Sequence, residues 1–121
     1  MIAVGIGLMG ALGAVTRYLT AEWVARWWHG RLPLATLLIN LAGAFALGLV
    51  TGIFAQPVQQ STRLLLGTGF LGGFTTFSTL SYESLTLFRR GETRVAWLNV
   101  GVSLVGGLAL AALGLWLGFA L

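Results

Sequence analysis

The sequence predicts an all-α integral membrane protein with four transmembrane helices. Of its 121 residues, 57% are hydrophobic and 8% are charged, whereas about a quarter of the residues in a typical soluble domain are charged. Uncharged runs cover residues 1–16, 32–62, 64–82 and 95–121. Because a helix needs about 20 mainly apolar residues to cross a bilayer, we expect a single four-helix transmembrane domain over residues 1–121.

The polar residues exclude several classes of function. The chain has no Cys, no Asp and one His, so it lacks thiols, paired carboxylates and metal-ligand clusters, and we expect that it is not an enzyme. Its net charge of +4 comes from arginines at loops and helix ends, which is typical of membrane orientation and lipid contact rather than of nucleic-acid binding. Its 18 glycines indicate close helix packing. Four helices cannot enclose a wide pore alone, so we expect an oligomer.

The first helix is expected from about Ile2 to about Trp27. Gly10 and Gly13 are spaced so that a neighbouring helix can approach closely. Arg17 lies near the second end of this helix and has two interpretations. Its side chain either extends to lipid phosphates or lines a cationic vestibule that concentrates anions.

The second helix is expected from about Pro33 to about Ala55. Asn40 lies on a stripe of small and hydroxyl residues along this helix. A buried Asn can simply bridge two helices. Its amide can also offer two N–H donors without a fixed charge, which suits a dehydrated anion that must later leave.

The third helix is expected over residues 62–88, with a break near the midplane at residues 72–76. Adjacent glycines followed by hydroxyl residues are unusual there, because each freed N–H or C=O group needs a partner in hydrocarbon. Half-helices that meet at a break can present carbonyls to a cation and N–H groups to an anion. Alternatively, Gly69 and Gly73 form only a packing face, but packing does not explain the Thr, Phe and Ser residues that follow.

Glu83 follows this stretch and has two interpretations. It is either a buried gate or proton-sensitive group, or an acid that pairs with the arginines of the third loop. Those arginines are Arg89, Arg90 and Arg94.

The fourth helix is expected from about Val95 to about Ala120, with Asn99 and Ser103 on one stripe. Together with Asn40 and the hydroxyl groups of the third helix, these residues can line a narrow track of uncharged donors. The positive edge of a phenyl ring, such as that of Phe77, is another weakly electropositive surface. Such a track suits a small, strongly hydrated anion.

These residues resemble the small fluoride channels of the Fluc type, also called CrcB, and the likeness covers all four helices. The residues that carry it are Gly72-Gly73-Phe74-Thr75-Thr76-Phe77-Ser78-Thr79 with Glu83, Gly13-Ala14-x-x-Arg17-Tyr18, Asn40 and Ser103. The resemblance implies a multi-pass protein of the cell (inner) membrane that exports fluoride passively from the cytoplasm. It also implies an antiparallel, dual-topology homodimer with two pores.

The resemblance further assigns roles to particular residues. A structural sodium ion (Na+) on the dimer axis would be bound by the carbonyl groups of Gly72 and Thr75 from each subunit. Arg17 would serve the vestibule, and Glu83 would match the acidic residue after the motif and is a possible gate. The pore and fluoride-binding positions would be Asn40, Phe77, Ser78, Thr79, Leu80 and Ser103.

Two residues depart from the family pattern. Leu80 stands where the family usually has a second Phe, so the phenyl-lined part of the pore is expected to be incomplete there. Asn99 stands where a Tyr is common and is expected to enlarge the polar track.

The arginines bear on the identity of the second subunit. The first and third loops carry Arg26, Arg31, Arg89, Arg90 and Arg94, whereas the second loop carries only Arg63. The positive-inside rule would place both termini outside, which is a stronger bias than a dual-topology homodimer needs. A heterodimer with an oppositely oriented relative is therefore an alternative to the homodimer.

Two other functions compete with a fluoride channel. One is a proton-coupled small four-helix transporter that uses Glu22 or Glu83. The other is a structural membrane module that oligomerises through its glycine faces.

Overall fold

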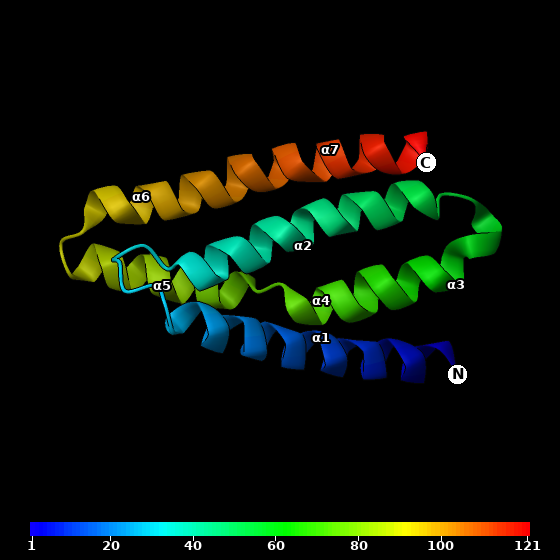
Figure 1. The fold of residues 1–121 in the computed structure, drawn as a ribbon, viewed down its shortest axis with the longest axis horizontal. Helices are drawn as coiled ribbons and strands as arrows, with labels where there is room; N and C mark the ends of the chain where they lie inside the picture. The colour runs from blue at the N-terminus through cyan, green and yellow to red at the C-terminus, as the bar shows by residue number, and fades with distance from the viewer.

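The computed structural model describes all residues, 1–121, and confirms the all-α prediction. Figure 1 shows that the helical segments lie side by side. The elements are α1 (Ile2–Ala25), α2 (Leu34–Ile53), η1 (Pro57–Gln59), α3 (Gln60–Arg63), η2 (Leu64–Leu71), α4 (Gly72–Phe74), α5 (Phe77–Arg89), α6 (Thr93–Gly101), η3 (Val102–Gly106) and α7 (Gly107–Ala120). η2 and η3 are π-helical turns inside longer helical runs.

The chain reverses direction at each connection, so both termini lie at the same end of the molecule (Figure 1). α1 lies beside the run from α3 to α4, that run lies beside α2, and α2 lies beside α7. The opposite end holds the loop of residues 26–33 and the turn between α5 and α6. In that turn Gly91 has a φ of +80°, a left-handed conformation that glycine adopts without a Cβ clash.

Two helix ends differ slightly from the predicted ones. α1 ends at Ala25 rather than near Trp27, and the indole Nε1 of Trp28 donates to the carbonyl of Leu32 at 2.8 Å within the loop that follows. α2 begins at Leu34, one residue after the predicted start, and Pro33 is its N-cap. The fixed φ of proline suits this position at the entry to a helix.

Three helices are long and apolar enough to cross a membrane: Ile2–Ala25, Leu34–Ile53 and Thr93–Ala120. The third hydrophobic segment differs from these, because Thr75 and Thr76 separate the helical run that ends at Phe74 from α5. α5 has 13 residues, fewer than the roughly 20 that a span requires. No single continuous helix therefore covers this segment.

Glycines bring α2 and α7 into backbone contact. A methyl group added at Gly48 would collide with the carbonyl of Ala111, and one added at Gly114 would collide with the carbonyl of Phe45. Lipid provides little hydrophobic drive between helices, so close approach of this kind is a main source of their packing energy. This contact fixes the position of α2, the helix that carries Asn40.

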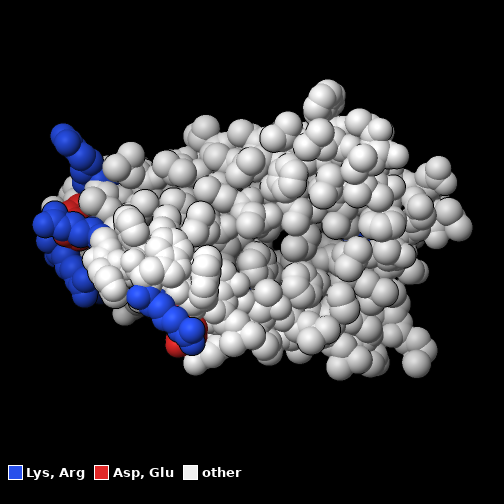
Figure 2. Space-filling view, in the orientation of Figure 1, with Lys and Arg blue, Asp and Glu red and all other residues white.

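In the view of Figure 2, charged side chains gather at one end of the molecule. This is the end formed by the 26–33 loop and the turn between α5 and α6. One salt bridge is present, between Arg31 Nε and Glu92 Oε1 at 3.1 Å, and it joins these two connections. The rest of the visible surface is uncharged, as a lipid-facing surface must be.

Candidate functional site

The third segment leaves the helical conformation at two residues. Thr75 has φ −81° and ψ 158°, and Thr76 has φ −147° and ψ 119°, so both are extended. Gly72 and Gly73 remain helical. The interruption is thus shorter than the predicted range of residues 72–76 and lies at the threonines rather than at the glycines.

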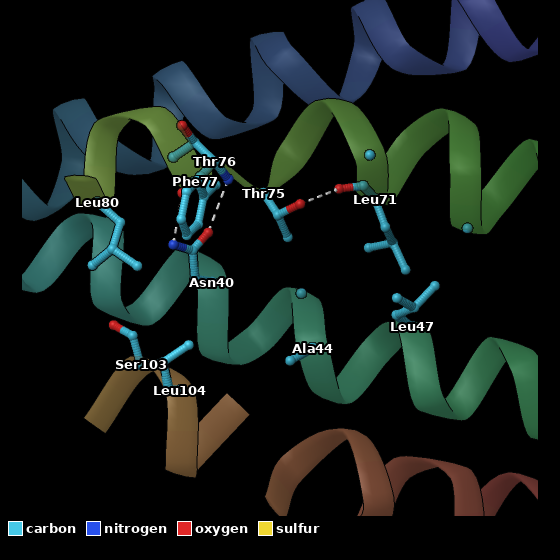
Figure 3. A pocket seen from close by; sticks show the side chains of 13 residues that line it. Asn40, Ala44, Leu47, Leu71, Thr75, Thr76, Phe77, Leu80, Ser103 and Leu104 are labelled. Atoms are coloured by element: carbon cyan, nitrogen blue, oxygen red, sulfur yellow. Dashed lines mark hydrogen bonds between the residues drawn. The ribbon is translucent and has the colours of Figure 1, made fainter. Parts of the chain in front are cut away.

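Asn40 on α2 holds the backbone of Thr76 with both ends of its amide (Figure 3). Its Nδ2 donates to the Thr76 carbonyl at 2.8 Å, and the Thr76 N–H donates to Asn40 Oδ1 at 2.9 Å. The Thr76 hydroxyl in turn accepts a hydrogen bond from the N–H of Thr79 at 3.2 Å, which makes Thr76 the N-cap of α5. Side chains thus replace the hydrogen bonds that a continuous helix would make internally.

Two carbonyl groups lose their helical donors as a result. In an α-helix each N–H donates to the carbonyl four residues earlier. The N–H of Thr76 would reach Gly72 but donates to Asn40, and the N–H of Thr79 would reach Thr75 but donates to the Thr76 hydroxyl. The carbonyls of Gly72 and Thr75 are therefore open to other partners, and carbonyl oxygens suit hard cations.

α1 approaches the interruption at backbone contact. A methyl group added at Gly13 would collide with the carbonyl of Phe70, and one added at Gly73 would collide with the backbone of α1. One helical turn beyond Gly13, Arg17 Nη1 lies 3.4 Å from the carbonyl oxygen of Thr75. The half-buried Arg17 side chain is therefore directed at the interruption, and its role in a vestibule stays a prediction.

A cavity of about 340 Å³ opens beside the interruption, between α2, the third segment and η3 (Figure 3). It brings together residues from the second, third and fourth predicted helices, which were expected to line the polar track. The predicted site residues in its lining are Asn40, Gly72, Thr75, Phe77, Leu80 and Ser103. Leu80 is 6% exposed and belongs to the wall, whereas Phe77 is 75% exposed.

The polar groups of this cavity carry no charge. One N–H of Asn40 is bonded to Thr76, and its second N–H is free to donate. The hydroxyl of Ser103 is buried and has no hydrogen-bond partner. Such a lining can replace part of the water around a small anion without the tight hold of a fixed positive charge.

Ser78 and Thr79 lie outside this cavity, on the exposed side of the first turn of α5. Thr79 Oγ1 accepts a hydrogen bond from Thr76 Oγ1 at 3.0 Å, so its own proton remains available. Together with Phe77 they form an exposed patch next to the cavity, which we call the α5 entry face. Their part in the pore stays a prediction.

Glu83 lies in a different, smaller cavity of about 150 Å³ near the charged end, with Arg31, Tyr82 and Arg90 among its lining residues. Glu83 Oε1 is buried without a hydrogen-bond partner and forms no salt bridge. The interpretation that Glu83 pairs with the arginines of the third loop is therefore wrong for this chain. A role as a gate stays a prediction.

Sequence reasoning missed two features of this region. Thr76 was named only as part of the hydroxyl-rich stretch and not as the N-cap of a helix, although a hydroxyl residue just before a helix is a typical N-cap signal. The second feature is a bond between α5 and α6, in which Asn99 Nδ2 donates to Ser84 Oγ at 3.0 Å. Asn99 is fully buried and does not line the large cavity, so it ties two helices together there instead of extending that lining.

Comparison with known proteins is consistent with these features. Residues 4–115 match the family described as "CrcB-like protein, Camphor Resistance (CrcB)". The chain is 42% identical over 120 residues to "Fluoride-specific ion channel FluC 1" of Bacillus cereus (strain ATCC 10987 / NRS 248), covering 98% of this chain and 88% of the relative. It is also 42% identical over 120 residues to "Fluoride-specific ion channel FluC" of Hydrogenovibrio crunogenus, covering 98% and 89%.

A third relative, "Fluoride-specific ion channel FluC 1" of Carboxydothermus hydrogenoformans, is 44% identical over 115 residues, covering 93% of this chain and 89% of the relative. All three relatives are named as ion channels, not as enzymes. Because the match extends over nearly the whole chain, all four helical segments are included in it. The chain therefore belongs to the CrcB family.

Proposed function

We propose that this protein is a fluoride-selective channel that exports fluoride passively from the cytoplasm across the cell (inner) membrane. The observation that carries the proposal is the cavity at Thr75 and Thr76, which uncharged donors and a phenyl ring line. The choice of fluoride is supported by the relatives that are named as fluoride-specific channels.

The chemistry of the lining suits fluoride better than chloride. Fluoride is the smaller ion and binds water more strongly, so it needs strong donors close to it when its hydration shell is removed. The free N–H of Asn40 and the free hydroxyl of Ser103 are such donors, and the edge of the Phe77 ring adds weak positive potential. Without a fixed charge in the lining, the ion can leave as well as enter.

We propose further that a sodium ion binds at the interruption, between the carbonyl groups of Gly72 and Thr75 of two subunits. Two observations support this site: both carbonyls lack helical donors, and Gly72 is exposed, so a second copy can approach it. When bound, the ion would supply a fixed positive charge that holds two interruptions together. The protein's own part is to keep helical N–H donors away from these carbonyls, which Asn40 and Thr76 do by accepting those donors.

We propose that the channel is an antiparallel dimer with two pores, and the α5 entry face supports the presence of a second subunit. The exposed hydroxyls of Thr16 and Thr51 donate to the carbonyl four residues earlier, whereas the Thr79 hydroxyl only accepts, from Thr76. Facing lipid, this hydroxyl would have no acceptor for its proton, so this face needs a cover of protein or water. A second subunit placed against Phe77, Ser78 and Thr79 would cover this face and close the open side of the cavity. Each subunit would contribute one cavity, which gives two pathways.

The second subunit is either another copy of this chain or an oppositely oriented relative. The homodimer is the simpler assembly. The gathering of charge at one end of the molecule supports the heterodimer, because the positive-inside rule then favours one orientation for this chain.

Efflux from liposomes tests the proposal. Liposomes that contain the purified protein should release fluoride much faster than chloride, without an imposed proton gradient. Phe77→Ile should abolish fluoride efflux, while Phe119→Ile should not, because Phe119 is similarly exposed, at 64%, but does not line the cavity. Equal chloride and fluoride efflux would contradict the assignment.

A second variant tests the anion directly. Asn40→Asp keeps an oxygen that can accept from the Thr76 N–H but replaces the N–H donors by a negative charge. Fluoride efflux should fall by at least about tenfold, since a carboxylate at this place repels the ion. Unchanged efflux in a folded Asn40→Asp variant would mean that the ion does not pass this cavity.

Proton-coupled transport is the alternative, and the buried, unpartnered oxygen of Glu83 favours it. Under this alternative, a proton gradient should accelerate efflux and Glu83→Gln should remove that acceleration. Fluoride efflux that does not depend on the proton gradient would rule the alternative out.

A further inference from the structure

We propose that Arg17 weakens sodium binding at the interruption, because its guanidinium competes with the ion for the carbonyl of Thr75. The inference rests on the sodium site of the proposed function and adds a residue of α1 to it.

The position of Arg17 is fixed by backbone packing. Gly13 and Gly73 bring α1 and α4 so close that a methyl group at either position would collide with the opposing backbone. Arg17 follows Gly13 by one turn, and its Nη1 lies 3.4 Å from the Thr75 carbonyl oxygen. This separation is long for a hydrogen bond, so the attraction depends mainly on the charge of the guanidinium.

The charge of Arg17 is not neutralised by an acid. The salt bridge between Arg31 and Glu92 is the one ion pair of the chain. The Thr75 carbonyl also lies just beyond the C-terminal end of a helical run, where the helix dipole favours a cation. Arg17 therefore supplies a positive charge to the same negative end that would attract sodium.

A sodium ion bound to this oxygen would share it with the guanidinium, whose Nη1 lies 3.4 Å away from it, and the two positive charges would repel. Removal of the charge should therefore increase the apparent sodium affinity by about tenfold or more, at the effective dielectric constant usual for proteins. If the Arg17 side chain only filled space, removal of its charge would leave the apparent sodium affinity unchanged.

Three substitutions separate charge from structure. Arg17→Gln removes the charge and keeps an N–H donor, whereas Arg17→Lys keeps the charge and loses the planar fork. Arg26→Gln is the matched control, because it removes one positive charge from the exposed loop after α1. Arg17→Met provides a second neutral variant if Arg17→Gln does not fold.

The readout is the thermal melting of the purified full-length protein in detergent, over a range of sodium chloride with choline chloride to hold the ionic strength constant. The sodium concentration at half-maximal stabilisation should fall by about tenfold or more in Arg17→Gln, and should stay near the wild-type value in Arg17→Lys and Arg26→Gln. An unchanged midpoint in Arg17→Gln, or an equal shift in Arg17→Lys or Arg26→Gln, would overturn the inference.

The test is distinct from the test of the channel. If sodium does not stabilise the wild-type protein at all, the sodium site and the inference about Arg17 both fail, while fluoride efflux still decides whether the protein is a channel. If sodium stabilises the wild type but Arg17→Gln is not shifted, only the inference about Arg17 fails.

Discussion

The side-chain amide of Asn40 pairs with the backbone of Thr76 as a second peptide group would, accepting from its N–H at 2.9 Å and donating to its carbonyl at 2.8 Å. α2 thereby supplies hydrogen bonds that the third segment gives up when it leaves the helical conformation. The interruption thus depends on a residue 36 positions away in the sequence.

Loss of this amide should destabilise the protein. In Asn40→Ala the N–H of the buried Thr76 would have no partner, which costs about 1–3 kcal/mol. Unfolding in mixtures of detergent and dodecyl sulfate measures the change. Asn99→Ala is the control, because it also removes a buried amide bond, but one outside the large cavity. Both variants should be destabilised, while only Asn40→Ala should change fluoride selectivity; a selectivity change in both would contradict the assignment.

The N-cap of α5 makes a separate contribution. Thr76→Val keeps the shape of the side chain but removes the oxygen that accepts from the N–H of Thr79, so stability should fall by about 1 kcal/mol. Thr51→Val serves as a comparison, since the Thr51 hydroxyl only donates to the carbonyl of Leu47 within α2. If both variants lose the same stability in the same unfolding assay, Thr76 has no special role at the interruption.

Glycine positions should differ sharply in their tolerance of alanine. Gly48→Ala places a methyl group against the carbonyl of Ala111, and α2 and α7 must separate to make room, so we expect a loss of about 2 kcal/mol or more. Gly7→Ala, also inside a helix, meets nothing within 4 Å and should be neutral or stabilising by up to about 1 kcal/mol. Equal melting temperatures for the two variants would show that α2 and α7 are not in backbone contact.

Leu80 offers a gain-of-function test. It lies in the wall of a cavity of about 340 Å³, which has room for a phenyl ring. Leu80→Phe should restore a second aromatic edge and increase the fluoride efflux rate about two-fold or more, with selectivity over chloride retained. Leu80→Met, which nearly conserves volume without a ring, should leave the rate near the wild-type value. A faster rate in Leu80→Met as well would indicate an effect of side-chain shape rather than of the ring.

The orientation of the chain can be measured with introduced cysteines, because the sequence has none. Ser61→Cys marks the exposed α3, at the end of the molecule that holds the termini, and His29→Cys marks the arginine-rich end. When the chain is expressed alone in cells, an impermeant thiol reagent should label Ser61→Cys and not His29→Cys if the arginines fix one orientation. Labelling of both positions in comparable amounts would favour dual topology and the homodimer.

The sequence predicted the helices well because the length of apolar runs is a local property. It predicted the interruption less well. Gly72 and Gly73 suggested that the break starts there, yet both remain helical, and Gly73 packs against the backbone of α1. The break falls at Thr75 and Thr76 because Asn40 takes the N–H of Thr76, a contact between distant residues that no local pattern reveals.

The site residues show the same limit. Asn40 and Ser103 were selected as polar members of helix stripes, and Phe77 was selected for the positive edge of its ring. The structure does bring all three to one cavity. The hydrogen-bond partners of the Glu83 and Asn99 side chains were not predictable, because they depend on which neighbouring side chain lies within reach. A helix periodicity identifies a face but not the partner that the face meets.

The close contact between α1 and α4 also has a consequence for motion. Because glycine backbones meet there without intervening side chains, the first half of the third segment cannot tilt without pushing α1 aside. α5 is joined to its neighbours by side-chain hydrogen bonds instead, through Asn40 at its beginning and through Asn99 further along, and a helix held in this way can shift without a clash of backbones. If the cavity widens, we therefore expect α5 to move more than the earlier half of the third segment, which the contact with α1 holds in place.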